Sequence, residues 1–322
     1  MATIEIIGLG AMNVDHLYRV DKVVVDSEQL VTDSVSLSGG SSANTIYGLA
    51  KLGVRTGFVG AVGTDEHGKG LIENFTTAGV DTSQIRIKQR TRTGAALCFS
   101  DKLGRRALYI SPGANSLLTS EDINLDYLNQ AKIVHLSSFA DDKQFKLQLN
   151  LVKEIGGSVK ISLAPGMLYA SKGLKALAPL LKRTYVIFIN REEVEQLTSK
   201  DFRAGAKECL KLGCQIVAVT LGKGLAAGKS KTISGYIRDA ERDYEIEREE
   251  MGSESVIETT GAGDAFAAGF LFGLHKNKRI EECGLLGDIM ADFAIKEMGA
   301  RKGLPSLAQL ARRYLERSGQ QL

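Results

Sequence analysis

The chain has 322 residues, of which 43% are hydrophobic and 25% are charged, with 41 Lys and Arg against 38 Asp and Glu. A net charge of +3, with both signs mixed along the chain, argues against binding to nucleic acid or to a charged membrane surface. No apolar run reaches the roughly 18 residues that a membrane-spanning helix needs, and the N-terminus lacks the pattern of a secretion signal. We therefore expect a cytoplasmic globular protein that is large enough for one α/β domain.

Apolar, β-branched runs alternate with helical patterns along most of the chain. The predicted strands are Ile4–Gly8, Thr56–Ala61, Ala95–Ser100, Ile133–Leu136, Val159–Leu163, Tyr185–Asn190 and Gln215–Leu221. The predicted helices are Ser42–Leu52, His67–Ala78, Asp142–Ile155, Gly173–Leu181, Arg191–Leu197, Arg203–Leu212, Asp264–His275, Ile280–Met298 and Ser306–Arg317. This order predicts a mostly parallel sheet with helices on both faces, in which ligands bind beyond the carboxyl ends of the strands.

Two stretches interrupt this alternation and predict a small β-layer beside the main sheet. Val20–Leu37 and Gln84–Ser111 carry alternating patterns that are typical of antiparallel strands. We interpret them as a lid, with strands at about residues 15–37 and 84–111. A third β-rich stretch, Ala226–Val256, is strongly charged and predicts antiparallel edge strands with a solvated loop.

The first predicted strand runs into Gly8-x-Gly10, which is how many dinucleotide-binding domains begin. The third glycine of that fingerprint is replaced by Asn13, and the acid expected about 20 residues further on falls inside the predicted lid. A nicotinamide-dependent oxidoreductase is therefore a remote alternative. The other interpretation is a tight turn that aims Asn13 and Asp15 at a ligand.

A second glycine-rich stretch, IETTGAGDAFAAGFLFGL at Ile257–Leu274, has more chemical content. Small residues and a helix N-terminus, which carries about half a positive charge, can hold an anion. Asp264 would repel a bound phosphate, but it could accept a proton from a hydroxyl that attacks a phosphoryl group. In an isolated motif the same acid could simply cap the helix. No GK[ST] follows, so the stretch is not a Walker A loop.

Four motifs carry a resemblance that spans essentially the whole chain. They are SGGSSANTIYGLAKLG (Ser38–Gly53), INREEVEQLT (Ile189–Thr198), TLGKGLAA (Thr220–Ala227) and ETTGAGDAFAAG (Glu258–Gly269). In order and spacing they resemble the motifs of the ribokinase-like (PfkB) family of carbohydrate and nucleoside kinases. The resemblance implies a ribokinase-like α/β fold, with a mostly parallel, doubly wound sheet flanked by helices and a small β-sheet lid. It also implies a single kinase domain over residues 1–322.

The resemblance implies Mg²⁺-dependent transfer of the terminal phosphoryl group of ATP, or of another nucleotide, to a hydroxyl of a sugar such as ribose. Nucleosides and sugar phosphates are the alternative acceptors. Asp264 would be the general base, and Gly261, Ala262 and Gly263 would form the anion hole. The implied nucleotide-binding residues are Asn190, Thr220, Gly222 and Gly224, and Glu193 would lie near Mg²⁺. The implied acceptor-binding residues are Asn13, Asp15, Gly39, Gly40 and Asn44.

The chemistry of the acceptor-binding residues agrees with these roles. A polyol needs donors and acceptors at fixed points, which Asp15 and the two asparagines can supply. Gly39-Gly40 would let the main chain approach the sugar without a Cβ in the way. Asn44 lies in an apolar helix, where a buried amide needs partners. Asp15 could instead be a turn residue.

Departures from the family pattern leave several points open. Glu258 stands where many members have Asp, in a region that in ribokinase helps to bind a monovalent cation, so K⁺ dependence is open. Ser137 or Ser138 takes the place of an acidic sugar ligand of ribokinase. Arg92 lies beside the predicted lid, where the sugar-phosphate kinases of the family have an arginine that meets the substrate phosphate. An exposed arginine can also simply be solvated.

Family members often dimerise through the lid strands, so the resemblance implies a homodimer that covers exposed sheet edges. A non-catalytic sugar-binding sensor is a third alternative, but Asp264 and the anion-hole residues are intact. The four cysteines form no CxxC pair or zinc-binding spacing, and we expect reduced, buried thiols.

Overall fold

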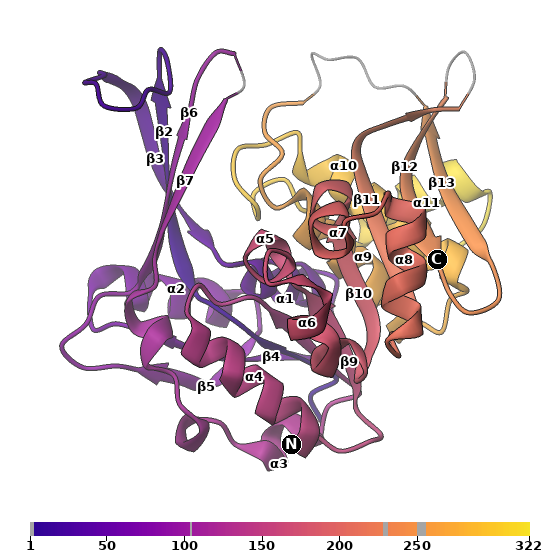
Figure 1. The fold of residues 1–322 in the computed structure, drawn as a ribbon, viewed down its shortest axis with the longest axis horizontal. Coiled ribbons are helices and arrows are strands. Elements are labelled where there is room, and N and C mark those ends of the chain that lie inside the picture. The colour runs from indigo at the N-terminus through magenta and orange to yellow at the C-terminus, as the bar shows by residue number, and fades with distance from the viewer. Residues whose placement is uncertain (1–2, 104, 228–230, 250–255) are drawn as a thin grey trace.

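The computed structural model describes residues 3–103, 105–227, 231–249 and 256–322. Figure 1 shows a broad sheet covered by helices, with a smaller lid sheet that projects from one side. The strands are β1 (Ile6–Leu9), β2 (Asn13–Val20), β3 (Val31–Gly39), β4 (Thr56–Val62), β5 (Asp81–Ile87), β6 (Gly94–Ser100), β7 (Arg106–Ser111), β8 (Ile133–Ser137), β9 (Lys160–Ala164), β10 (Thr184–Asn190), β11 (Ile216–Ala226), β12 (Lys231–Arg238) and β13 (Asp243–Glu249). The helices are α1 (Ser41–Lys51), α2 (Glu66–Thr77), α3 (Leu125–Asn129), α4 (Asp142–Glu154), α5 (Gly166–Ala170), α6 (Gly173–Leu181), α7 (Arg191–Thr198), α8 (Phe202–Lys211), α9 (Ala262–His275), α10 (Ile280–Ala294) and α11 (Leu307–Ser318).

Within the described ranges the main sheet has nine strands in the order β13-β12-β11-β10-β9-β8-β1-β4-β5. The strands from β5 to β11 are parallel, and β12 and β13 are antiparallel additions at the edge. The predicted fold class is thus confirmed. The chain places β4 and β5 on one side of β1 and then β8 to β11 on the other. This reversal next to β1 is where doubly wound sheets bind ligands.

The core consists of two hydrophobic clusters, one on each face of the sheet. One cluster takes side chains from the helices α3 to α8 and the other from α1, α2 and α9 to α11. All seven residues of β4 are buried, because helices cover both faces of a parallel sheet. The four cysteines are buried as well. None of the helices in the part of the chain that the structure describes is long and apolar enough to cross a membrane.

The lid is a four-stranded sheet in the order β3-β2-β6-β7. The prediction of antiparallel strands is right for β2–β3 and β6–β7 but wrong for β2–β6, which pair in parallel. The physical reason is that β2 follows β1 and β6 follows β5, and these two preceding strands point the same way. The lid prediction was also wrong for residues 84–87, which belong to β5 at the edge of the main sheet.

The glycines of the first strand allow close packing. A Cβ on Gly8 would lie 2.4 Å from Cγ1 of Ile46 in α1, and a Cβ on Gly10 would lie 2.4 Å from Oγ of Ser137 in β8. Neither glycine has a positive φ. Contacts with the protein's own α1 and β8 therefore explain both glycines, without a bound dinucleotide.

Candidate active site

The first turn of α9 holds Asp264 against the start of α1. Ser41 Oγ donates to Oδ1 of Asp264 (2.7 Å), and Asn44 Nδ2 donates to Oδ2 (2.8 Å). Thr45 Oγ1 donates to the main-chain carbonyl of the same residue (3.2 Å). These hydrogen bonds join segments more than 200 residues apart in sequence, and they fix the carboxylate in one orientation.

The environment of Asp264 suits a general base. Burial raises its pKa to about 6, although the hydrogen bonds from Asn44 and Ser41 and the charge of Arg301 lower it. The charge of Glu193 adds to the increase. A carboxylate with this pKa is mostly ionised at pH 7, yet it accepts a proton more readily than an ordinary aspartate does.

Asp15 in β2 supplies a second carboxylate, on the lid side of the site. Burial raises its pKa to about 7, the charge of Arg301 opposes this, and the charges of Asp264 and Glu258 add to it. Asp15 packs over Gly39, where a Cβ would lie 2.2 Å from the carboxylate carbon. No hydrogen bond among the described residues ends on this carboxylate, so both of its oxygens can accept hydrogen bonds from a ligand.

Asn13, at the start of β2, is oriented by a neighbour that the sequence did not reveal. Asn115 Nδ2 donates to Oδ1 of Asn13 (2.9 Å) and to the Met12 carbonyl (3.1 Å), and Asn115 Oδ1 accepts from Met12 N (2.9 Å). The amide oxygen of Asn13 is therefore engaged, and its NH₂ group is the part that can donate to a ligand.

Gly40 precedes α1 with φ 96°, and a Cβ there would lie 2.2 Å from the carbonyl oxygen of Ala11. Both the conformation and the close approach require glycine. The turn places the first residues of α1 beside Asp264. Gly39 lies against Asp15, and Gly40 starts the helix that holds Asp264, so the two glycines position both carboxylates.

At the N-terminus of α9, Gly261 adopts φ 80°, and a Cβ there would lie 2.3 Å from Cβ of Ala300. The N–H of Ala262 donates to the Thr259 carbonyl (3.2 Å). Gly263 is exposed, and a Cβ on it would meet no described atom within 4 Å. The packing of the protein therefore does not require this glycine, whereas a ligand that approaches the helix N-terminus would.

The predicted nucleotide side lies at the ends of the neighbouring strands β10 and β11, where Asn190 pairs with Thr220. Asn190 and Glu193 form a capping box, with Glu193 N donating to Asn190 Oδ1 (2.8 Å) and Asn190 N donating to Glu193 Oε2 (3.0 Å). Burial raises the pKa of Glu193. Both residues thus start α7, and Glu193 Oε1 has no hydrogen-bond partner within the described ranges.

The strand β11 bulges after Thr220. Its register against β12 shifts between Thr220 and Leu225, and Gly222 and Gly224 in the bulge have φ 59° and 85°. Arg248 Nη2 donates to the Gly222 carbonyl (3.0 Å). The bulge interrupts the pairing with β12 beyond Thr220, at the carboxyl edge of the parallel strands, and Gly222 is exposed there.

Arg92 lies between β5 and β6, two residues before Gly94 pairs with Asn13. Its side chain is exposed and makes no hydrogen bond or ion pair with any described residue. Ser137 is buried and accepts from Ser42 N (3.0 Å), so this serine is used inside the protein. Of the two serines considered as sugar ligands, Ser138 is the more exposed.

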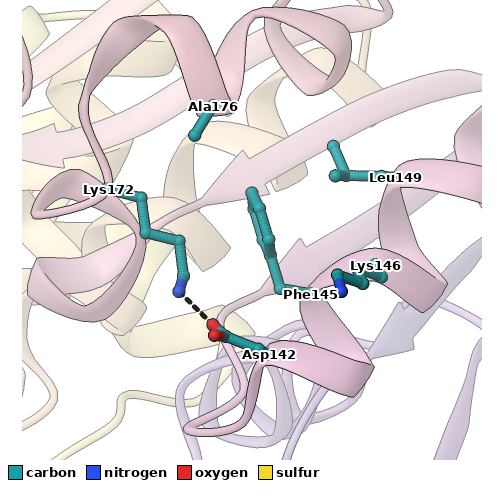
Figure 2. A pocket seen from close by; sticks show the side chains of 6 residues that line it. All are labelled: Asp142, Phe145, Lys146, Leu149, Lys172 and Ala176. Atoms are coloured by element: carbon teal, nitrogen blue, oxygen red, sulfur yellow. Dashed lines mark hydrogen bonds and ion pairs between the residues drawn. The ribbon is translucent and has the colours of Figure 1, made fainter.

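A surface pocket lies apart from these residues, between α4 and α6 (Figure 2). It is lined by Asp142, Phe145, Lys146, Leu149, Lys172 and Ala176. Figure 2 shows Lys172 paired with Asp142 beside the Phe145 ring. None of the predicted site residues lines this pocket, and we assign no chemistry to it.

Sequence reasoning missed Ser41, Thr45, Asn115 and Arg301. Ser41 lies in the motif that follows Gly39-Gly40, and its place at a helix start was the one available signal. Asn115 sits in PGANS, which reads as an ordinary turn. Arg301 has no periodic or motif signal, because its partners lie in other parts of the chain.

Comparison with known proteins agrees with this geometry. Residues 3–307 match the model of the pfkB family of carbohydrate kinases. An uncharacterized sugar kinase from Archaeoglobus fulgidus is 38% identical over 261 residues, which cover 80% of this chain and 98% of that protein. A nucleoside kinase from Methanocaldococcus jannaschii is 26% identical, and the match covers 95% of each chain.

The solved structure of a ribokinase from Thermotoga maritima superimposes with a TM-score of 0.79 at 25% identity. The superposition covers 97% of this chain and 99% of that one. The family match thus extends over both the main sheet and the lid. The chain belongs to the pfkB family and is a carbohydrate or nucleoside kinase.

Proposed function

We propose that the chain transfers the terminal phosphoryl group of ATP to a hydroxyl of a sugar such as ribose, with Asp264 as the general base. The observation that carries this proposal is the geometry of Asp264, which α1 holds at the exposed N-terminus of α9. A second carboxylate, Asp15, faces it from the lid. We also propose that residues 1–322 act as one kinase domain.

In this proposal Asn13 and Asp15 bind ring hydroxyls of the acceptor, beside the main chain of Gly39 and Gly40. Asp264 accepts the proton of the attacking hydroxyl as the new O–P bond forms and the bond to the leaving ADP breaks. Gly261, Ala262 and Gly263, at the positive end of α9, stabilise the negative charge on the transferred group. Asn44 orients the base.

For the nucleotide, we propose that the bulge at Thr220, Gly222 and Gly224 lies along the phosphates, next to Asn190. Membership in the family implies ATP together with Mg²⁺. A Mg²⁺ ion usually keeps several waters and binds to one or two carboxylates plus phosphates. The free oxygen of Glu193 fits this donor set. The ion would neutralise phosphate charge when bound.

The acceptor could also be a nucleoside or a sugar phosphate. Exposed Arg92, close to the start of β6, supports the sugar phosphate, because a guanidinium fork suits phosphate oxygens. The lid edges β3 and β7 carry exposed apolar side chains, including Val31 and Tyr109, and these support a homodimer through the lid.

A coupled kinase assay should test ribose, ribose phosphates and nucleosides against ATP and ADP. Asp264→Asn should then lower kcat on the best acceptor about 10²–10⁴-fold, as expected for loss of a general base, with ADP affinity within threefold. Asp201→Asn is a matched control, since this carboxylate only caps α8 and Asn caps equally well. Near-normal turnover of Asp264→Asn would refute the base assignment.

A further inference from the structure

Arg301 is a buried cation next to the acceptor half of the site, and only 8% of its surface is exposed. Its guanidinium donates to three oxygens on three different segments. Nε donates to Asn44 Oδ1 (2.9 Å), Nη1 to Asn74 Oδ1 (2.6 Å) and Nη2 to the Gly39 carbonyl (3.1 Å). The group therefore ties together α1, α2 and the end of the lid strand β3.

The same guanidinium lies over two aromatic rings. Its central carbon lies 5.2 Å from the centre of the Tyr47 ring and 5.1 Å from that of Phe75. Cation–π contacts with two rings and three directed hydrogen bonds leave a planar fork little freedom to move. Arg301 thus provides a rigid reference point inside the protein.

Arg301 decides which way the Asn44 amide faces. A guanidinium has only donors, so the Asn44 oxygen must point toward it. The NH₂ group of Asn44 then points to the other side, where it donates to Oδ2 of Asp264 (2.8 Å). An ionised carboxylate has only acceptors. Arg301 therefore donates to Asn44 and Asn44 donates to Asp264, and the reversed amide would satisfy neither contact.

We propose that Arg301 is a positioning residue for phosphoryl transfer, which acts on Asp264 through the Asn44 amide. Its second action is electrostatic, because its positive charge favours the ionised forms of Asp15 and Asp264. This inference rests on the proposed role of Asp264 as the base. The arginine itself touches no reacting atom.

Several negative charges lie around Asp15 and Asp264, and Arg301 must balance them. Asp264 is faced by Glu193 of α7 and by Asp15 of β2, and Asp15 is also faced by Glu258 from the segment before α9. Arg301 is the positive charge that lowers the pKa of both aspartates. Burial lowers its own pKa to about 10, so it stays protonated at neutral pH.

The test compares Arg301→Lys, which keeps the charge but loses the fork, with Arg301→Met, which loses both. It uses Mg²⁺–ATP and whichever of ribose, adenosine or inosine the wild type phosphorylates best. We expect Arg301→Lys to lower kcat about tenfold and Arg301→Met about 100-fold, with the KM for ATP unchanged, because misplaced groups mainly raise the barrier. Only Arg301→Met should move the acidic limb of the kcat profile to higher pH.

A double-mutant cycle separates positioning from a general loss of stability. In an Asn44→Ala background, Arg301→Lys should change kcat less than about twofold, because its route to Asp264 is already broken. Arg317→Met is the matched control, since that arginine binds Asp288 and the Glu247 carbonyl outside the site. It should lower the melting temperature without lowering kcat.

The inference is wrong if folded Arg301→Lys turns over within threefold of the wild type, or if its effect adds fully to that of Asn44→Ala. If Arg301→Met fails to fold, Arg301→Lys and its double-mutant cycle with Asn44→Ala still test the inference. Asp264→Asn, assayed in parallel, keeps the two proposals apart. If it loses turnover while the Arg301 variants keep it, only this inference fails.

Discussion

The proposed acceptor half and the proposed nucleotide half of the site are built in different ways. On the acceptor side, the carboxylates of Asp15 and Asp264 are partly buried, and Asp264 is held by side chains from α1. On the nucleotide side, Gly222 and Gly224 give the main chain its positive φ angles in the bulge of β11, and Asn190 is held by a local helix cap. One half depends on long-range side-chain contacts and the other on local backbone conformation.

This difference determines what each half tolerates. A side chain removed from the acceptor half changes charge and hydrogen bonding among several partly buried charged groups, where both effects are stronger than in water. The nucleotide half offers mainly backbone groups, which a side-chain substitution leaves in place. Substitutions in the acceptor half should therefore have the larger and more selective effects.

Among the substitutions that compare the two halves, the largest effect should come from Asp15→Ala. The variant loses a hydrogen bond between a carboxylate and an acceptor hydroxyl, which is worth roughly 1.5–3 kcal/mol. Steady-state kinetics should show the acceptor KM rise about 30–100-fold, with the KM for ATP unchanged. Thr220→Val, on the other side, should raise only the KM for ATP, by about threefold. A rise in the ATP KM alone for Asp15→Ala would reverse the assignment of the two halves.

The pH dependence of activity should also distinguish the acceptor half from the nucleotide half. Burial raises the pKa of Asp264 to about 6 and that of Asp15 to about 7, and the two titrate as a coupled pair. Since the ionised forms are the active ones, kcat/KM for the acceptor should be nearly full at pH 8 and fall through this range, by about 50-fold between pH 6 and pH 5 where both groups are protonated. Calorimetric binding of ADP should change little from pH 8 to pH 6. A kcat/KM that stays flat to pH 5 would contradict the paired carboxylates.

The smallest effect should come from Gly263→Ala, where activity and stability move in opposite directions. Alanine favours a helix over glycine by about 0.5–1 kcal/mol, so thermal unfolding should occur at a slightly higher temperature. The new methyl group would crowd a phosphoryl group at the N-terminus of α9, and kcat should fall about fivefold, which is less than loss of a whole donor would cause.

Gly70→Ala is the matched control for this substitution. Gly70 is exposed in α2, and a Cβ there would also meet no described atom within 4 Å. The control should gain similar stability with unchanged kcat. If Gly263→Ala kept the same kcat as Gly70→Ala, the phosphoryl group would not occupy the space beside Gly263.

The sequence predicted the parts of the molecule that depend on local chemistry. The β-branched runs of the buried strands and the four motifs led to the correct fold class and family. Gly261 was selected as part of a helix start, and its positive φ shows why glycine stands there. The roles of the individual site residues stay predictions until the variants are measured.

The remaining features depend on distant pairs. Asn115 orients Asn13 across 102 positions, and Arg301 reaches Asn44 across 257 positions, so no local pattern marks them. The parallel pairing of β2 with β6 was missed for the same reason, since alternation shows that a strand exists but not its partner. Likewise, the need for Gly8 and Gly10 became clear only when α1 and β8 were seen packed against them.

The separation between Gly39 and Arg301, 262 positions, also has a consequence for how the protein is made. The ribosome completes the lid strands and α1 long before the segment that carries Arg301 leaves the exit tunnel. Until then the Asn44 amide and the Gly39 carbonyl lack their partner, and contacts between segments so far apart in sequence form slowly. The orientation of the Asn44 amide is thus completed late in folding, and a chain cut before Arg301 would keep most of the sheet but lose the partner that orients this amide toward Asp264.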